Sequence, residues 1–121
     1  MRHLPLSLAL CLGFVASSVA CGPETHERTP MVLERTGDAE AGAPLYATHC
    51  ASCHAEDGTG TPQGPNLPNE TNHHSDEEIV EAILSGRGTM PAFDDDLGDQ
   101  DVADLLAFLR AGEARLSGVV E

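Results

Sequence analysis

Two cysteines and one histidine stand together in the segment Cys50-Ala51-Ser52-Cys53-His54. Cysteines three positions apart lie on one side of a helical turn, so both thiols can form thioether bonds to the vinyl groups of one haem. The imidazole that follows can ligate the haem iron, because a neutral imidazole is a good axial ligand. The segment therefore predicts one haem c, held covalently through Cys50 and Cys53, with His54 on the iron.

Two other chemistries use a Cys-x-x-Cys pair, namely thiol redox exchange and tetrahedral zinc binding. A zinc site needs more ligands, and the chain has no second pair of closely spaced cysteines. A thiol redox motif is expected near a pattern of strands, and no strand-like alternation precedes Cys50. Haem attachment is therefore the favoured interpretation.

The opposite face of the iron needs a second ligand, and Met90 is the best placed thioether. It lies in the segment 86–93 (GRGTMPAF), a loop after a helical pattern that can reach the far side of the ring. Met31, by contrast, lies in a segment without periodicity. We therefore expect His54 and Met90 to be the two iron ligands.

His73 and His74 are rivals for the second ligand position. Both lie in a polar stretch, and paired histidines in such a stretch are usually exposed to solvent. We therefore expect neither of them to bind the iron.

The chain begins with the features of a secretory signal peptide over residues 1–20: a basic start, an apolar run and small residues at the end. We expect export, to the bacterial periplasm. Cys21 resembles the lipidated cysteine of bacterial lipoproteins, and two outcomes stay open there, simple cleavage and lipidation with a membrane tether. Residues 21–36 predict a flexible linker, because Gly, Pro, Thr and charges mix without period. The folded domain is expected over 37–112 and a C-terminal tail over 113–121.

Helical periodicity recurs in the folded domain, over residues 38–50, 75–86 and 99–112. Asp38 is the expected N-cap of the first helix, and Pro44 inside it should make that helix start later or bend. Ser75 and Glu78 form a capping-box pattern at the start of the second. Residues 55–74 predict a loop. The fold class is therefore all-α.

Large apolar side chains are scarce, with one Tyr, three Phe and no Trp in the whole chain. A domain this small has difficulty in building a sufficient hydrophobic core. A haem is a large apolar plate that would supply the missing volume. We therefore expect the helices to wrap around one haem, and the haem-free domain to be largely unfolded.

The chain is strongly acidic, with a net charge of −14 that falls to −15 once the leader and its single arginine are removed. Nucleic acid and anionic membrane surfaces are therefore excluded as partners, and a redox protein with a basic docking patch is expected. We expect a monomer. Six aspartates near the presumed ligand loop predict salt-sensitive docking: Asp94, Asp95, Asp96, Asp99, Asp101 and Asp104.

Over residues 37–112 the chain resembles the small single-haem class I c-type cytochromes. Gly42 and Tyr46 stand where that family has a Gly and an aromatic residue in its first helix, before CASCH. Leu105 and Phe108 match their partners in the last helix. The resemblance implies a cytochrome c-like helical domain in which these two helices cross closely.

The resemblance also assigns roles in the loops around the haem. The segment 64–67 (GPNL) resembles the loop in which the Pro65 carbonyl accepts a hydrogen bond from the haem-binding histidine, here His54. Arg87 is placed for a haem propionate. Ala55 departs from the pattern, since the family usually has Gly there.

An iron with two protein ligands has no vacant position, so it suits one-electron transfer. We expect an electron carrier, and not an enzyme, that shuttles electrons between exported or membrane-bound redox proteins. The alternative is a haem-based small-ligand sensor or enzyme in which Met90 is a labile sixth ligand.

Overall fold

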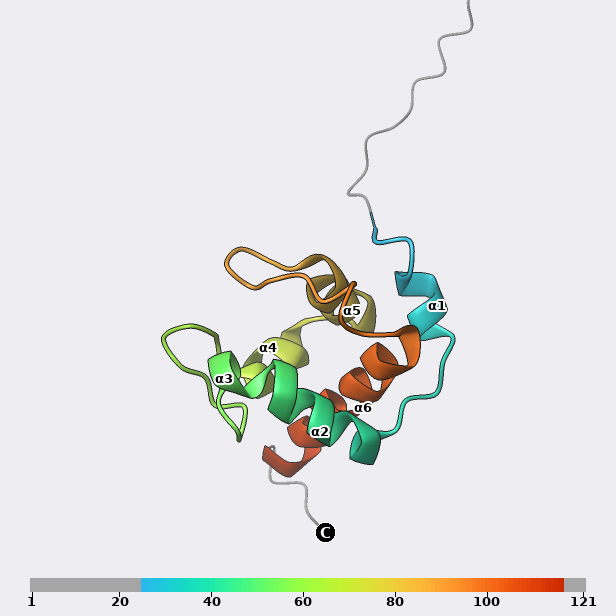
Figure 1. Cartoon of the computed structure of the whole chain (residues 1–121). Coiled ribbons are helices and arrows are strands. Elements are labelled where there is room, and N and C mark those ends of the chain that lie inside the picture. The colour runs from blue at the N-terminus through green and yellow to red at the C-terminus, as the bar shows by residue number, and fades with distance from the viewer. Residues whose placement is uncertain (1–24, 117–121) are drawn as a thin grey trace, which may run out of the picture.

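The computed structural model describes residues 25–116, with side chains up to Gly112, and this part of the chain is all-α (Figure 1). Its helices are α1 (Thr29–Leu33), α2 (Ala39–His49), α3 (Ala51–His54), α4 (Leu67–His73), α5 (Asp76–Ser85) and α6 (Asp99–Leu116). Within the described residues the only β-type pairings are two isolated bridges, one in each long loop. The predicted fold class is confirmed. None of the helices described is long and apolar enough to cross a membrane.

Helices α2 and α6 cross at van der Waals contact through a glycine. A Cβ atom built on Gly42 would lie 2.1 Å from the carbonyl oxygen of Asp104 and 2.7 Å from Cβ of Phe108. One turn further along α2, the rings of Tyr46 and Phe108 lie with their centroids 5.1 Å apart. The close crossing expected from the resemblance is therefore present, and only a residue without a side chain fits at position 42.

The first predicted helix has the expected N-cap but not the expected late start. Asp38 accepts a hydrogen bond from the backbone N–H of Glu40 at 2.9 Å, and α2 begins at Ala39 and continues through Pro44. The expectation that Pro44 would delay the start is wrong, because the cap and the packing of α2 on α6 hold the turns on both sides of the proline.

The second predicted helix is confirmed at both ends. The Ser75 hydroxyl accepts from the Glu78 N–H, and the Glu78 carboxylate accepts from the Ser75 N–H, so the capping box is complete in α5. The pKa of Glu78 is lowered mainly by the hydrogen bond that its carboxylate accepts from the backbone N–H of Ser75, and then by the one from the Ser75 hydroxyl. At the other end, Gly86 closes the helix with a positive φ of 75°.

The third predicted helix continues beyond its expected end near Gly112, to Leu116 in α6. Glycine only lowers helix propensity, by about 1 kcal/mol, and a helical turn tolerates it. The expected boundary between domain and tail at this residue is therefore wrong. The inner face is as expected, with Val102 and Leu105 fully buried in the core.

The N-terminal part of the domain differs from the sequence prediction. Residues 25–36, the described part of the expected linker 21–36, contain α1, and its Thr29 and Val32 are each only 1% exposed. The expectation of a flexible linker is wrong here, because Val32 packs into the common core and Arg28 donates a hydrogen bond to the carbonyl oxygen of Asp94, far along the chain. Cys21 and the expected signal peptide lie outside the described residues.

The expected loop 55–74 also contains a helix. The side chain of Asn66 accepts a hydrogen bond from the N–H of Asn69 at 2.9 Å and so caps α4, and Pro68 lies in its first turn. Asn at the N-cap and Pro early in the first turn are ordinary helix-start signals. The prediction failed because composition rich in Pro and Asn is also typical of loops.

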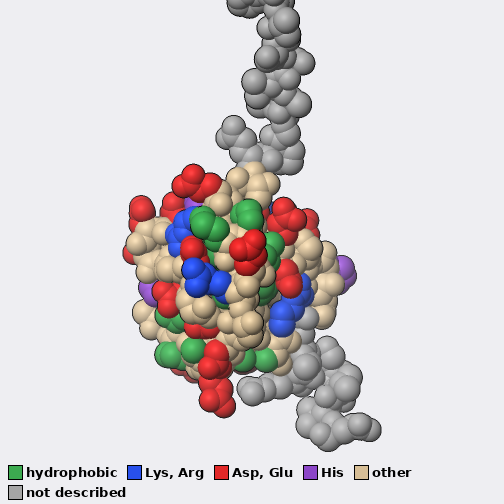
Figure 2. All heavy atoms as spheres, turned by 90° about the vertical axis from the view of Figure 1, so that its right-hand side faces the viewer, with side chains coloured by type: hydrophobic (Ala, Val, Ile, Leu, Met, Phe, Trp, Pro, Cys, Tyr) green, Lys and Arg blue, Asp and Glu red, His purple; other side chains and the backbone are tan. Residues whose placement is uncertain are grey.

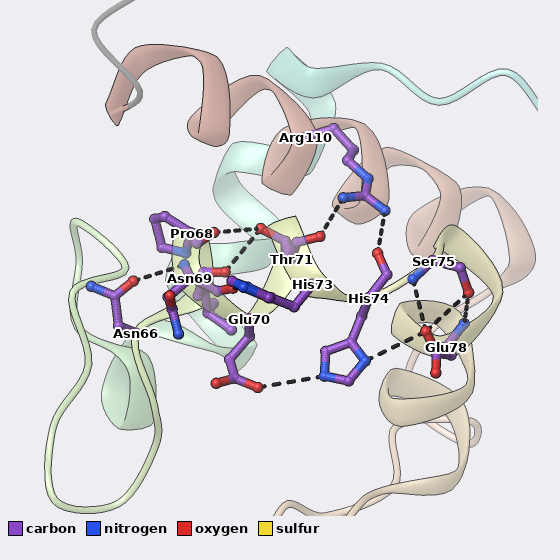
Figure 3. A network of polar contacts seen from close by, with 11 residues as sticks. Asn66, Pro68, Asn69, Glu70, Thr71, His73, His74, Ser75, Glu78 and Arg110 are labelled. Atoms are coloured by element: carbon purple, nitrogen blue, oxygen red, sulfur yellow. Dashed lines mark hydrogen bonds and ion pairs between the residues drawn. The ribbon is translucent and has the colours of Figure 1, made fainter.

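One arginine ties the last helix to the two before it (Figure 3). Arg110 of α6 donates to the carbonyl oxygens of Thr71 at 2.6 Å and His74 at 2.9 Å, and to the Asp76 carboxylate at 2.8 Å. Two of these acceptors are backbone groups at the α4–α5 junction. The junction is therefore held against α6 by charge-assisted hydrogen bonds.

Candidate haem attachment site

The attachment motif forms one tight helical turn directly after α2. Cys50 ends α2 and caps α3, and its carbonyl oxygen accepts from the N–H groups of Cys53 at 3.2 Å and His54 at 3.0 Å. Both thiols are free and half-buried. The turn therefore has the one-sided arrangement that two thioether bonds to a single ring require.

The first thiol of the motif, Cys50, is not an activated nucleophile. Burial, and then the neighbouring Cys53 thiolate, raise the pKa of the Cys50 thiol to about 11. Reactive Cys-x-x-Cys pairs have a thiol pKa lowered below 8.5, because the thiolate is the nucleophile. The neutral, half-buried Cys50 thiol argues against thiol exchange and fits an attachment residue.

The histidine of the motif is held in the tautomer that a metal ligand needs. His54 is 8% exposed, and its Nδ1 lies 2.9 Å from the carbonyl oxygen of Pro65. A carbonyl oxygen can only accept, so Nδ1 carries the proton and the lone pair of Nε2 is free. The predicted contact between Pro65 and His54 is therefore present, and the neutral imidazole fits an axial ligand of haem iron.

The loop after the motif folds back over the histidine at a second glycine. A Cβ atom on Gly64 would lie 2.9 Å from Nδ1 of His54 and 2.8 Å from the Cys53 carbonyl oxygen. The Thr61 hydroxyl donates to that same oxygen at 2.6 Å, and the Gly60 N–H donates to the His54 carbonyl at 2.9 Å. Gly64 thus lets the loop bring its carbonyl to the imidazole. The sequence analysis did not predict this role, although Gly64 directly precedes Pro65.

Ala55, which departs from the family pattern, has a strained backbone conformation. Its φ of 67° and ψ of 159° lie in a region that is essentially confined to glycine. The Tyr46 hydroxyl donates to its carbonyl oxygen at 2.6 Å and holds the strained residue in place. This hydrogen bond therefore joins α2 to Ala55, the residue that follows the attachment motif, across nine residues.

Replacing Tyr46 with phenylalanine should change how stability depends on pH. Burial, followed by smaller effects of Cys50 and Asp57, raises the pKa of Tyr46 from 10.0 to about 12. In the unmodified protein, the contribution of Tyr46 to the unfolding free energy should be constant below pH 10 and fall as pH rises from 10 towards 12, because the unfolded state loses its phenolic proton first. Haem attachment removes the Cys50 effect and leaves burial, the main cause.

The Tyr46→Phe variant keeps the ring contact with Phe108 but lacks the ionisable group. We expect it to be less stable by about 1 kcal/mol at pH 7, through loss of the hydrogen bond to Ala55, and to lack the tyrosine part of the alkaline decline. Guanidinium unfolding at several pH values up to 11.5 measures both. An identical alkaline decline in the two proteins would contradict the assignment to Tyr46.

Met90 lies in the loop 86–98 between α5 and α6, here called the ligand loop. The N–H of Arg87 donates to the Met90 carbonyl at 3.1 Å, and the N–H of Met90 donates to the Arg87 carbonyl at 3.0 Å. Gly86 permits this turn, because a Cβ atom there would lie 2.6 Å from the Met90 carbonyl oxygen. The Met90 side chain is half-buried and packs against the core. The turn thus presents a thioether at the edge of the core.

An aromatic contact joins the ligand loop to the attachment motif. The ring of His49, the residue before Cys50, meets the edge of Phe93 with 5.9 Å between centroids. In Figure 1 the ligand loop and the loop after α3 also project from the same side of the helical frame. The loop that carries Met90 therefore passes close to the turn that carries the two cysteines.

The remaining candidate residues are Arg87 and the two histidines His73 and His74. The Arg87 side chain is exposed on the ligand loop, so its predicted role towards a propionate stays a prediction. Nδ1 of His73 lies 2.7 Å from the Asn69 carbonyl oxygen. His74 lies between Glu70 at 3.6 Å and Glu78 at 3.4 Å, as Figure 3 shows. Both histidines are thus engaged locally, in keeping with the expectation that neither binds iron.

The six aspartates expected to form a docking face are not equivalent. Asp104 is 7% exposed and accepts from the N–H of Asp38 at 2.8 Å, and Asp99 is paired with Arg28 at 2.7 Å. Among these six, only Asp95 and Asp96 of the ligand loop are exposed and make no hydrogen bond or ion pair of this kind. Four of the six charges thus cap or pair within the domain, so the docking face expected from six aspartates is reduced to two of them. Salt-sensitive docking itself stays a prediction.

The geometry around His54 and the all-helical frame place this protein among the c-type cytochromes. Residues 37–109 match the family described as cytochrome c oxidase, cbb3-type, subunit III, and the chain belongs to that family. The prediction of a small single-haem class I cytochrome is confirmed. Its cofactor is one covalent haem c, for which Cys50 and Cys53 have the required spacing.

Relatives of similar length include cytochromes c6. A cytochrome c6 from Picosynechococcus sp. is 31% identical over 113 residues, which cover 84% of this chain and 89% of that protein. The crystal structure of a cytochrome c6 from the diatom Phaeodactylum tricornutum is similar with a TM-score of 0.58 and 27% identity, over 65% of this chain and 98% of that one. These similarities support an electron-transfer protein.

Other relatives are much longer proteins. The cytochrome c subunit of a quinone-dependent alcohol dehydrogenase from Gluconobacter oxydans is 30% identical over 99 residues, 70% of this chain but 21% of that subunit. The FixP subunit of a cbb3-type oxidase from Bradyrhizobium sp. is 30% identical over 61% of this chain and 27% of that subunit. The chain therefore spans about a quarter or less of the length of these two subunits.

Proposed function

We propose that this cytochrome is a one-electron carrier whose haem iron is ligated by His54 and Met90. The observation that carries the proposal is the hydrogen bond from Nδ1 of His54 to Pro65, which leaves Nε2 free for the iron. The contact between His49 and Phe93 supports Met90, because it brings the ligand loop to the attachment turn. When bound, the haem supplies the redox chemistry, and a thioether ligand raises its reduction potential. The chain's own part is to hold two ligands in place with little movement.

Replacing Met90 with alanine tests the ligand assignment. The ferric protein should show the iron-to-sulfur charge-transfer band, and Met90→Ala should abolish it. The reduction potential should fall by on the order of 0.2 V, within the range of about 0.8 V over which axial ligands act. The reduced variant should also bind carbon monoxide. Met31→Ala is the matched control, because Met31 is 46% exposed on α1 and should leave all three properties unchanged.

The alternative, a sensor or enzyme with a labile sixth ligand, makes the opposite prediction. Rapid carbon monoxide binding by the reduced, unmodified protein would favour it and contradict the carrier. A charge-transfer band that survives in Met90→Ala would show that another group binds the iron.

We further propose a redox protein partner with a basic docking patch. The support is the net charge of −14, together with the exposed Asp95 and Asp96 on the ligand loop. Attraction between exposed charges is screened beyond about 8 Å at physiological salt, so electron transfer with the partner should slow several-fold as ionic strength rises from 10 to about 200 mM. Stopped-flow kinetics measure this. A rate that does not respond to salt would contradict electrostatic docking.

The proposed setting is outside the cytoplasm, in the periplasm of a bacterium. The signal-peptide pattern of residues 1–20 supports export, and Cys21 supports a lipid tether if it is acylated. Arg87 on the ligand loop would neutralise a haem propionate, as an exposed guanidinium close to the ring edge can.

A further inference from the structure

The segment 26–29, here called the N-terminal clasp, lies outside the region 37–109 that defines the family match, yet it is hydrogen-bonded at several points to the rest of the domain. It leads into α1, whose first residue is Thr29, and forms a turn closed by the hydrogen bond from the Thr29 N–H to the His26 carbonyl at 2.9 Å. Thr29 at the end of the turn is buried. The clasp therefore has a defined conformation and a defined docking position.

On one side the clasp holds α5. The carboxylate of Glu81 accepts from the backbone N–H of His26 at 2.8 and 3.0 Å, and also from the Thr29 hydroxyl. Glu81 lies little more than one turn before Gly86, where α5 ends and the ligand loop begins. The clasp is thus anchored at the helix end from which the ligand loop starts.

On the other side the clasp holds the distal part of the ligand loop. The Arg28 guanidinium donates to the carbonyl oxygen of Asp94 at 2.6 Å and to that of Leu97 at 2.7 Å. It also donates to the Asp99 carboxylate at 2.7 Å, at the start of α6. All three nitrogens are used, and the side chains of Arg28 and Asp99 are each only 20% exposed. The face that carries α1 shows arginine side chains set among acidic ones (Figure 2).

The four residues of the clasp therefore bind Glu81, just before the ligand loop begins, and also the distal part of the loop itself. Within the loop, backbone hydrogen bonds join Arg87 with Met90 and tie the N–H groups of Asp96 and Leu97 to the Phe93 carbonyl, while the Phe93 N–H donates to the Ile83 carbonyl. The stretch 88–92 around Met90 has no other backbone hydrogen bond among those the structure describes. A loop opens more readily when its ends are free to separate, and charge-assisted hydrogen bonds such as those of Arg28 oppose this separation more strongly than neutral ones. We propose that Arg28 is a positioning residue that keeps Met90 on the iron; this inference rests on the proposed ligation by Met90.

The test compares two arginine variants of the haem-loaded protein. Arg28→Ala removes all three contacts with the ligand loop and α6. Arg35→Ala is the matched control, because Arg35 also pairs with Asp99, at 3.7 Å, but lies 45% exposed and serves no carbonyl of the loop. Arg28→Lys keeps the charge but cannot span both carbonyls and Asp99, so it should fall between the two.

The decisive measurement follows two signals in one guanidinium titration, the iron-to-sulfur band and the helical circular dichroism. In Arg28→Ala the band should disappear at lower denaturant than the helices, and carbon monoxide should bind the reduced protein about tenfold faster, as expected if the loop opens tenfold more often. Arg35→Ala should match the unmodified protein in both. Faster amide hydrogen exchange of Met90 and Phe93 in Arg28→Ala gives an independent readout.

The outcomes separate this inference from the proposed function. If the unmodified protein has no iron-to-sulfur band, the ligation by Met90 itself fails. If the band is present but is lost together with the helices in Arg28→Ala, and carbon monoxide binding is unchanged, the clasp only stabilises the fold and the inference is overturned. Equal effects of Arg28→Ala and Arg35→Ala would also overturn it, because charge alone would then explain them.

Discussion

Gly42→Ala should destabilise the domain by about 3 kcal/mol or more, a large effect for a single methyl group. The added Cβ would lie 2.1 Å from the Asp104 carbonyl oxygen and 2.7 Å from Cβ of Phe108, so α2 and α6 would have to move apart. Neither neighbour can yield alone, because one is helix backbone and the other is a Cβ atom fixed to it. The separation would also loosen the contact between the rings of Tyr46 and Phe108.

The matched control is Gly112→Ala, the same change at a half-buried position near the end of α6. No heavy atom lies within 4 Å of the Cβ position there, so alanine should stabilise the helix by up to about 1 kcal/mol. Chemical unfolding of both variants, followed by circular dichroism, measures the difference. Similar unfolding free energies for the two variants would show that the crossing distance does not limit the fold.

Gly64→Ala should disturb the haem ligand as well as the fold. Its Cβ would lie 2.9 Å from Nδ1 of His54 and 2.8 Å from the Cys53 carbonyl oxygen, which forces the loop away from the imidazole. We expect a loss of about 2 kcal/mol in unfolding free energy from the overpacking. The hydrogen bond to Pro65 should lengthen, so the imidazole becomes a weaker donor to ferric iron and the reduction potential should rise.

Ser52→Ala serves as the control for this experiment, because Ser52 is exposed within the attachment motif itself. It should leave both stability and potential unchanged. Unfolding and a redox titration of each variant are the measurements. A potential in Gly64→Ala equal to that of the control, with the stability loss present, would mean that the carbonyl of Pro65 does not tune the iron.

Local signals in the sequence predicted much of this structure. The capping box at Ser75, the N-cap at Asp38 and the glycine at the end of α5 define helix ends through hydrogen bonds to neighbouring residues. Such bonds depend on residues within one turn, so sequence reasoning reaches them. The attachment motif is local in the same sense, since its chemistry depends on residues within one helical turn.

Helices α1 and α4 were missed because their stability comes from elsewhere. Val32 makes α1 part of the core only when α5 and α6 are present to receive it, and Glu81 is 52 residues from the Thr29 that it binds. A helix of five residues has too few hydrogen bonds to form alone. The composition of this segment therefore predicted a linker, whereas contacts with residues far along the chain stabilise a helix.

By itself, the sequence determined the cofactor chemistry and predicted the first iron ligand, because Cys50, Cys53 and His54 stand within one turn of helix. The resemblance added the pairing of Pro65 with His54. Only the tertiary structure decided which aspartates face solvent, which glycines permit close contact and how residues 26–29 hold the ligand loop. These features depend on distances between segments far apart in the chain, and such distances are set by packing rather than by the order of neighbouring residues.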